Sequence, residues 1–174
     1  MRFLGGIVFG VVLVGAAAAA FVFSGAFDVA ASVPPGALEK RLAGFARDRS
    51  VAHRASSTPN PLGKDPAALR DGGEHYKEMC VTCHGAPGVD SSEIGEGLNP
   101  PAPDLTLARI QARSDGELFW IVQNGIRMSG MPAFGPTHKD REIWAIVAFL
   151  RHLPSLSPEE EKALAAATRE HEKD

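Results

Sequence analysis

Residues 78–88, "EMCVTCHGAPG", contain both cysteines of this 174-residue chain, Cys80 and Cys83, and His84 follows the second cysteine directly. Two thiols three positions apart are compatible with four kinds of site: a redox-active dithiol, a zinc site, a short structural disulfide and a covalent haem attachment. Each of the four needs a different surrounding fold, so the rest of the sequence has to distinguish them.

Three of these sites find little support in the remaining sequence. A thioredoxin-like dithiol needs a βαβ unit, and the chain shows no strand pattern. A tetrahedral zinc site needs two further ligands, and there is no third cysteine. A disulfide that closes so short a loop would stabilise the fold little. The C-x-x-C-H pattern instead predicts that Cys80 and Cys83 form thioethers to one haem c, with His84 as the proximal iron ligand.

Local signals predict an all-α domain around this motif. We expect helices at residues 65–79, 114–124 and 140–153. Their expected N-caps are Asp65, Ser114 and Asp140, because short polar side chains satisfy the free N–H groups of a first turn. The segment 85–103 has little periodicity, and so long a loop is rare in a compact domain unless it wraps something. A haem would supply the apolar core that these short helices lack.

The amino-terminal segment is predicted to cross a membrane. Residues 3–27 have no charged side chain, and about 20 apolar residues span a hydrocarbon core. A cleaved signal peptide is the alternative, but its apolar region is usually only about 7–15 residues long. The basic residues after the span oppose outward export by the positive-inside rule. Haem attachment outside the cytoplasm outweighs them, so we expect a single-pass protein of the bacterial cytoplasmic membrane with its haem domain on the periplasmic face.

Four segments follow from these patterns. They are an anchor at 1–27, a juxtamembrane helix and linker at 28–63, a haem domain at 64–155 and a charged helix or tail at 156–174. The helix expected at 37–54 has a basic side and an apolar side, which suits either lipid headgroups or the protein's own domain. Residues 56–63 have a linker composition, and we expect a flexible hinge there. The charged tail is expected to be solvated.

A sixth iron ligand has to come from beyond the motif. Met131 stands in "SGMPAFG", on a loop between two expected helices, and Pro132 stiffens the chain beside it. Met128, on the same loop, is the second candidate. The remaining candidates are histidines that we expect at the surface or at helix caps: His75, His138 and His152. We therefore expect His84 and Met131 as the two axial ligands.

From about residue 65 to residue 155 the chain resembles a class I monohaem c-type cytochrome, of the kind found as cytochrome subunits of bacterial oxidases and dehydrogenases. The matching residues are Cys80, Cys83 and His84 in "CVTCHG", Met131 in "GMPAF", and the helix "EIWAIVAFLRHLP" at 142–154. The resemblance implies the cytochrome c fold, with an N-terminal transmembrane helix added here.

The resemblance also implies two sets of contacts. In the family, the first and last helices cross, with a glycine and an aromatic residue of one against an aromatic residue of the other. Gly72, Tyr76 and Trp144 match these positions. The family also has a proline whose carbonyl accepts a hydrogen bond from the proximal histidine ring, and Pro103 in "PDL" is the candidate. Such a bond orients the ring and tunes the iron.

The expected function is one-electron transfer between respiratory or dehydrogenase complexes. Iron with histidine and methionine ligands has no open position, so the protein is expected to be an electron carrier without enzymatic activity of its own. Its expected partners are the membrane and a redox protein donor and acceptor. Nucleic acid is not expected at a net charge of −3, and neither is a small-molecule substrate. The alternatives are a dedicated cytochrome subunit of a periplasmic-facing dehydrogenase or terminal oxidase and, less favoured, a gas-binding haem sensor.

Overall fold

The computed structural model describes residues 2–171, and within them all regular structure is helical. The only extended pairing in this range is an isolated bridge between Ala86 and Val89. The chain divides into two units, one up to Val33 and one from Pro34 onward. The all-α prediction is confirmed.

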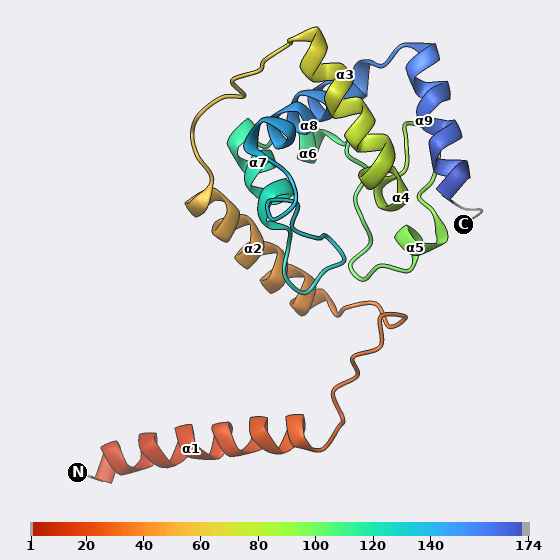
Figure 1. Cartoon of the computed structure of the whole chain (residues 1–174). Helices are drawn as coiled ribbons and strands as arrows, with labels where there is room; N and C mark the ends of the chain where they lie inside the picture. The colour runs from red at the N-terminus through yellow and green to blue at the C-terminus, as the bar shows by residue number, and fades with distance from the viewer. Residues whose placement is uncertain (1, 172–174) are drawn as a thin grey trace. The chain divides into compact units, whose positions relative to one another are not determined.

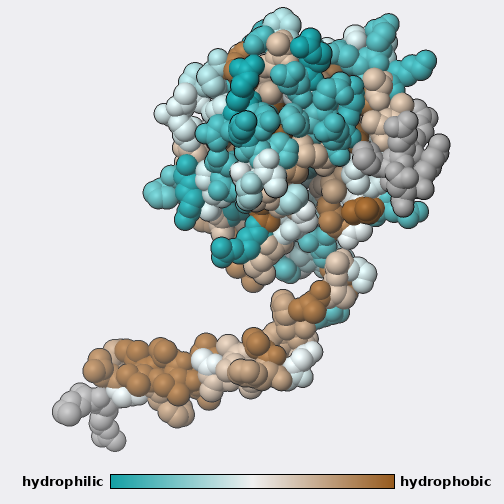
Figure 2. All heavy atoms as spheres, viewed as in Figure 1, coloured by the Kyte–Doolittle hydropathy of each residue, from teal (hydrophilic) through white to brown (hydrophobic). Residues whose placement is uncertain are grey.

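The first unit is one long apolar helix, α1, from Arg2 to Phe23. Its residues Phe3–Phe23 have a mean hydropathy of 2.5, and none of this stretch is buried against protein. Figure 2 shows hydrophobic residues over the visible face of α1. By length and composition this is a helix that can cross a membrane, and an N-terminal signal sequence has the same two properties.

The second unit contains the remaining helices. In chain order they are α2 (Ala37–Arg54), α3 (Pro66–His75), the π-helical turn η1 (Tyr76–Cys80), α4 (Val81–His84), α5 (Glu93–Glu96), α6 (Ala108–Gln111), α7 (Asp115–Asn124), α8 (Asp140–His152), the 3₁₀ turn η2 (Leu153–Ser155) and α9 (Pro158–His171). Figure 1 shows α3 crossing α8, α2 beside α7, and α9 on the side of α4.

The first helix of the domain is longer than the sequence predicts. The side chain of Asp65 accepts a hydrogen bond from the N–H of Ala67, and Pro66 begins α3 as expected. The helical path does not end at Met79 but continues through η1 and α4 to His84. A π turn inserts one extra residue per turn and often marks a functional site. Here the π turn ends at the buried Cys80, and η1 and α4 together carry the C-x-x-C-H motif on one helical segment.

The crossing of α3 and α8 is the most extensive helix contact in the second unit. The two backbones approach so closely that a methyl group at Gly72 would overlap the carbonyl oxygen of Ala145. Next to this contact the rings of Tyr76 and Phe149 lie 5.5 Å apart between centroids. The prediction of Trp144 as the aromatic partner was wrong, because Trp144 stacks on Phe119 of α7 at 4.2 Å.

The predicted N-caps of α7 and α8 agree with the structure to within one residue. Ser114 and Glu117 form the predicted capping box of α7, and the helix ends at Gly125 in a left-handed conformation with φ of 64°. The cap of α8 differs by one residue from the prediction. Lys139 is the N-cap, because its N–H donates to the Glu142 carboxylate at 2.6 Å, and Asp140 is the first helical residue.

The charged helix α9 is not a solvated tail. Leu164 and Thr168 are buried, and Leu164 joins the hydrophobic core that contains Tyr76, Cys80 and Phe149. At the start of α9 Glu160 lies 3.2 Å from the ring of His152. Leucine and threonine four positions apart share one helix face, whereas Glu159, Glu161 and Lys162 are exposed. Residues 172–174 of the predicted tail lie outside the described residues.

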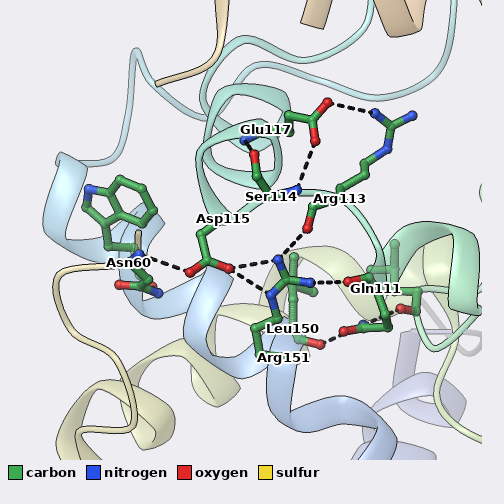
Figure 3. Close-up of polar contacts among 10 residues, drawn as sticks. Asn60, Gln111, Arg113, Ser114, Asp115, Glu117, Leu150 and Arg151 are labelled. Atoms are coloured by element: carbon green, nitrogen blue, oxygen red, sulfur yellow. Dashed lines mark hydrogen bonds and ion pairs between the residues drawn. The ribbon is translucent and has the colours of Figure 1, made fainter. Parts of the chain in front are cut away.

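The segment at 56–63 is also more ordered than a flexible hinge. The backbone N–H of Asn60 donates to Asp115 at 3.0 Å, and its side chain donates to the carbonyl of Trp144 at 2.8 Å (Figure 3). A methyl group at Gly116 would overlap the carbonyl of Ser56, so this segment lies directly against α7. Because Asn60 and Ser56 are both engaged, the hinge prediction for this segment was wrong.

A partly buried arginine, Arg151 of α8, makes further contacts in the same region. Arg151 donates to the Asp115 carboxylate at 2.8 Å and to the carbonyls of Gln111 and Arg113 at 2.6 and 2.5 Å (Figure 3). Burial tends to raise the pKa of Asp115, but the hydrogen bonds from Asn60 and Arg151 and the charge of Arg151 outweigh it and lower the pKa. Asp115 is therefore the shared acceptor between α8 and the segment that precedes α3.

The helix crossing can be tested at Gly72. We expect Gly72→Ala to lower the free energy of unfolding by about 2–3 kcal/mol, because the methyl group forces the α3 and α8 backbones apart. Gly44→Ala on α2 is the control, since its methyl group would lie 3.8 Å from its nearest neighbour. That variant should be unchanged or more stable by about 0.5–1 kcal/mol. Urea unfolding of the haem-loaded protein gives both values, and equal effects would contradict the close approach.

The Asp115 contacts predict an acid dependence of stability. Since its pKa is lower in the folded state than the ordinary 3.8, its contribution is complete above that value and is lost as the pH falls through the folded pKa. Asp115→Asn should therefore flatten the loss of stability as the pH falls below about 4. The control is Asp71→Asn on the exposed surface of α3. Parallel acid profiles for Asp115→Asn and the parent chain would contradict the prediction.

Candidate haem site

The three residues of the motif lie on consecutive turns of one helical segment. Cys80 ends η1 and is 9% exposed, while Cys83 and His84 lie in α4 and are partly exposed. The two cysteines are not joined by a disulfide. Residues three apart lie close to the same face of a helix, so both sulfurs can reach one flat ligand beside the helix. This arrangement fits a haem attached through two thioethers.

The imidazole of His84 is oriented by a contact across 19 positions of sequence. Its Nδ1 lies 2.9 Å from the carbonyl oxygen of Pro103. A carbonyl can only accept, so Nδ1 carries the proton and Nε2 keeps the lone pair that a metal requires. Burial lowers the pKa of His84, and the hydrogen bond to Pro103 partly opposes this. The ring is thus held neutral, as a ligand must be.

Pro103 is therefore where the resemblance implies it should be. The chain after Asn99 contains prolines at 100, 101 and 103, and the carbonyl of the last of them faces the ring. A hydrogen-bond partner on the far nitrogen fixes the orientation of a ligating histidine and raises its basicity. Its role in haem binding stays a prediction.

A second contact, which sequence analysis missed, holds the turn after His84. The hydroxyl of Tyr76, which is buried, donates to the carbonyl of Gly85 at 2.9 Å. Gly85 has φ of 65°, and a methyl group there would lie 2.5 Å from the carbonyl oxygen of Val89. Burial raises the pKa of Tyr76, so it stays a donor. The only sequence signal was that the single tyrosine of the chain stands four residues before Cys80.

The thiols are not activated for redox chemistry. Burial, and then the neighbouring Cys83, raise the pKa of Cys80 to about 12, and burial also raises the pKa of Cys83. Redox-active and catalytic cysteines have lowered pKa values, because the thiolate is the reactive form. The raised pKa values therefore do not support a dithiol that exchanges disulfides.

The motif also borders a cavity of about 450 Å³. Its walls are formed by Cys83, His84, Ala86, Gly88, Val89, Asp90, Ser91, Ala102 and Asp104. These residues come from the helix of the motif, from the loop behind it and from the two neighbours of Pro103. The long loop after Gly85 thus folds back over the motif, as a chain that wraps a prosthetic group does.

The two methionines of the loop between α7 and α8 differ in exposure. Met128 is 92% exposed and has φ of 60°, whereas Met131 is only partly exposed. The carbonyl of Met131 accepts from the N–H of Ile126 at 3.2 Å, and its N–H donates to Ser129 at 3.2 Å. Met131 is thus held in a short local turn. Its loop is separate from the helical segment of Cys80, Cys83 and His84 and from the segment that contains Pro103.

The other histidines have contacts elsewhere. The rings of His75 and His138 lie 5.3 Å apart between centroids, and His138 also packs edge-on against Phe134. His152 faces Glu160. Among the residues that the structure describes, no group of three or more His, Cys, Asp or Glu side chains could hold a metal ion.

Comparison with known families agrees with this geometry. Residues 67–150 match the family model described as cytochrome C oxidase, cbb3-type, subunit III, over slightly less than half of the chain. A search of curated proteins gave no match. The matched segment contains the crossing helices, the motif and both candidate methionines. It is a c-type cytochrome domain, which implies covalently bound haem c and a function in electron transfer.

The attachment can be tested one thioether at a time. We expect Cys83→Ala to retain haem on a denaturing gel through Cys80 alone. The α band of its reduced pyridine complex should move to longer wavelength, because one vinyl group stays conjugated. The double variant Cys80→Ala/Cys83→Ala should lose haem on the gel. Equal covalent haem in the double variant and the parent chain would contradict attachment at these cysteines.

Proposed function

We propose that this chain is a membrane-anchored monohaem electron carrier, with His84 and Met131 as the axial ligands of its single haem. The observation that carries the proposal is the 2.9 Å contact between His84 Nδ1 and the Pro103 carbonyl, because it leaves Nε2 free to bind iron. One haem is proposed because two cysteines, the whole supply of the chain, make one attachment motif.

In this proposal the protein residues position the haem and its ligands, and they take no part in making or breaking bonds. When bound, the haem iron supplies a one-electron couple between its ferrous and ferric states. Pro103 keeps the His84 ring in one orientation, and Tyr76 holds the turn that follows it. A site that changes little between two oxidation states suits electron transfer, because few groups have to move with each electron. We therefore propose a carrier without bond-making chemistry or a small-molecule substrate.

Support for Met131 as the sixth ligand comes from how its loop is fastened. The N–H groups of Phe134 and Gly135 donate to the carbonyls of Val122 and Gln123 at 3.1 and 2.9 Å. The loop thus returns along the end of α7, and Pro132 stiffens it next to Met131. A permanent thioether ligand needs such a rigid support. Met128, which is almost fully in water, lacks it.

The proposed location follows from α1 and from the haem. We propose that α1 is a retained anchor in a bacterial cytoplasmic membrane and that the cytochrome domain lies on its periplasmic face, where haem is attached. Donor and acceptor are then redox proteins or complexes that reach this face.

A second candidate is a dedicated cytochrome subunit of a terminal oxidase or dehydrogenase. It is favoured by the match to a family named for subunit III of cbb3-type oxidases. Helix α9 would then serve for docking through the charged surface that it leaves in water, because only Leu164 and Thr168 are buried among its described side chains. Purification in mild detergent separates the two candidates, since a subunit remains with its complex and a carrier does not.

The ligand assignment can be tested with matched methionine variants. We expect the reduced parent protein to bind no CO, and Met131→Leu to bind CO at one equivalent per haem. Losing a thioether ligand should also lower the reduction potential by on the order of 0.1 V. Met128→Leu, on the same loop, is the control and should leave both properties unchanged.

Two results would contradict this assignment. CO binding by the parent protein would mean an open or labile sixth position and would favour a gas sensor. A closed site in Met131→Leu together with CO binding in Met128→Leu would exchange the roles of the two methionines.

A further inference from the structure

Helix α2 presents an uncovered apolar stripe to solvent. Leu38, Leu42 and Phe45 are 70%, 61% and 68% exposed. Their spacing of four and three residues places them along one face of the helix. A different face of α2 packs against the domain, because Val51 is 1% exposed and Asp48 contacts Arg113. The stripe is therefore not the surface that attaches α2 to its own domain.

The same helix is basic, although the chain as a whole is acidic. Five Lys or Arg against two Asp or Glu give α2 a net charge of +3, whereas the whole chain has −3. Both acidic residues are engaged, since Glu39 accepts from the N–H of Gly36 and Asp48 pairs with Arg47 and Arg113. Within residues 2–171, no ion pair involves Lys40, Arg41 or Arg49. These cations remain available to anions outside the protein.

Chain length keeps α2 near the proposed membrane anchor. Thirteen residues, 24–36, separate the end of α1 at Phe23 from the start of α2 at Ala37. Even fully extended, they span at most about 45 Å. A basic helix with an apolar stripe, tethered this close to a bilayer, has the two properties that bind helices to lipid headgroups.

We propose that α2 lies in the headgroup layer of an anionic phospholipid membrane, with Leu38, Leu42 and Phe45 directed toward the acyl chains. Arg41 lies beside the stripe, Arg49 follows Phe45 one turn later on the same face, and both reach lipid phosphates. The proposal depends on the retained anchor but not on the redox function of the domain.

Lipid contact at α2 constrains the whole cytochrome domain. Arg113 at the start of α7 lies 2.5 Å from Asp48 of α2. The segment after α2 packs on Gly116 through Ser56, and Asn60 bonds to Asp115 (Figure 3). Because these contacts fasten α2 to α7, a helix fixed in the membrane surface fixes the orientation of the domain that carries His84.

The test determines whether lipid, water or protein surrounds the apolar stripe of α2. Leu42→Cys and, as a matched control, Ala43→Cys are each labelled with a nitroxide in the full haem-loaded chain, whose own cysteines are bound to haem. Ala43 is also exposed, and it points about 100° away around the helix. The chains are placed in vesicles of phosphatidylethanolamine and phosphatidylglycerol and kept reduced, so that the iron is diamagnetic. Collisions with oxygen and with an aqueous nickel chelate are then compared.

We expect the label at 42 to collide several-fold more with oxygen, and several-fold less with the nickel chelate, than the label at 43. Replacing phosphatidylglycerol by phosphatidylcholine should reduce this difference. Equal, high nickel collision at both positions would overturn the proposal, because the stripe would then lie in water. Low collision with both reagents at 42 would also overturn it, in favour of a contact with protein.

Flotation with the vesicles, measured first, separates this inference from the proposed anchor. A chain that stays in solution overturns both the retained anchor and the lipid contact of α2. A chain that floats while position 42 remains in water overturns the lipid contact alone. CO binding and the reduction potential report on the redox function independently of either result.

Discussion

The close approach of α3 and α8 at Gly72 is the contact on which the cytochrome domain depends. Without a side chain at this position, the backbone of α3 reaches the carbonyl of Ala145, and Tyr76 can pack against Phe149 one turn later. Tyr76 also begins the π turn that ends at Cys80. The position of the attachment motif is therefore set by a helix contact that contains none of the motif's own residues.

From this crossing, two independent supports converge on His84, the proposed proximal ligand. Tyr76 bonds to Gly85, the residue after His84, and Pro103 bonds to the ring itself. The first support comes from the helix before the motif, and the second comes from a loop 19 positions later in the chain. Each support restricts a different freedom, since Tyr76 holds the backbone and Pro103 holds the rotation of the ring. A site held in this way needs little rearrangement when an electron arrives.

Local signals in the sequence predicted the domain's helices well, and long-range pairing much less well. The caps of α3 and α7 depend on neighbouring residues, so the sequence shows them directly. Trp144 and Phe149 belong to the same helix but face different ways, and only a packed partner decides which of them meets Tyr76. Asn60 lies in a segment with linker composition, yet its polar groups find partners in α7 and α8. The C-x-x-C-H spacing could be read from the sequence, whereas the hydrogen bond between Tyr76 and Gly85 became apparent only in the folded structure.

The order found in residues 37–63 changes how far the cytochrome domain can travel. Had this stretch been flexible, about 40 residues would separate α1 from the first helix of the domain, and the root-mean-square reach would be about 35 Å. With α2 and Asn60 fastened to the domain, 13 linking residues remain, and the corresponding reach falls to about 20 Å. With α1 as the proposed membrane anchor, a shorter tether would confine the domain to a smaller volume and raise the effective concentration at partners close to the membrane. Redox partners whose docking surface stands farther from the membrane would be disfavoured by the same geometry.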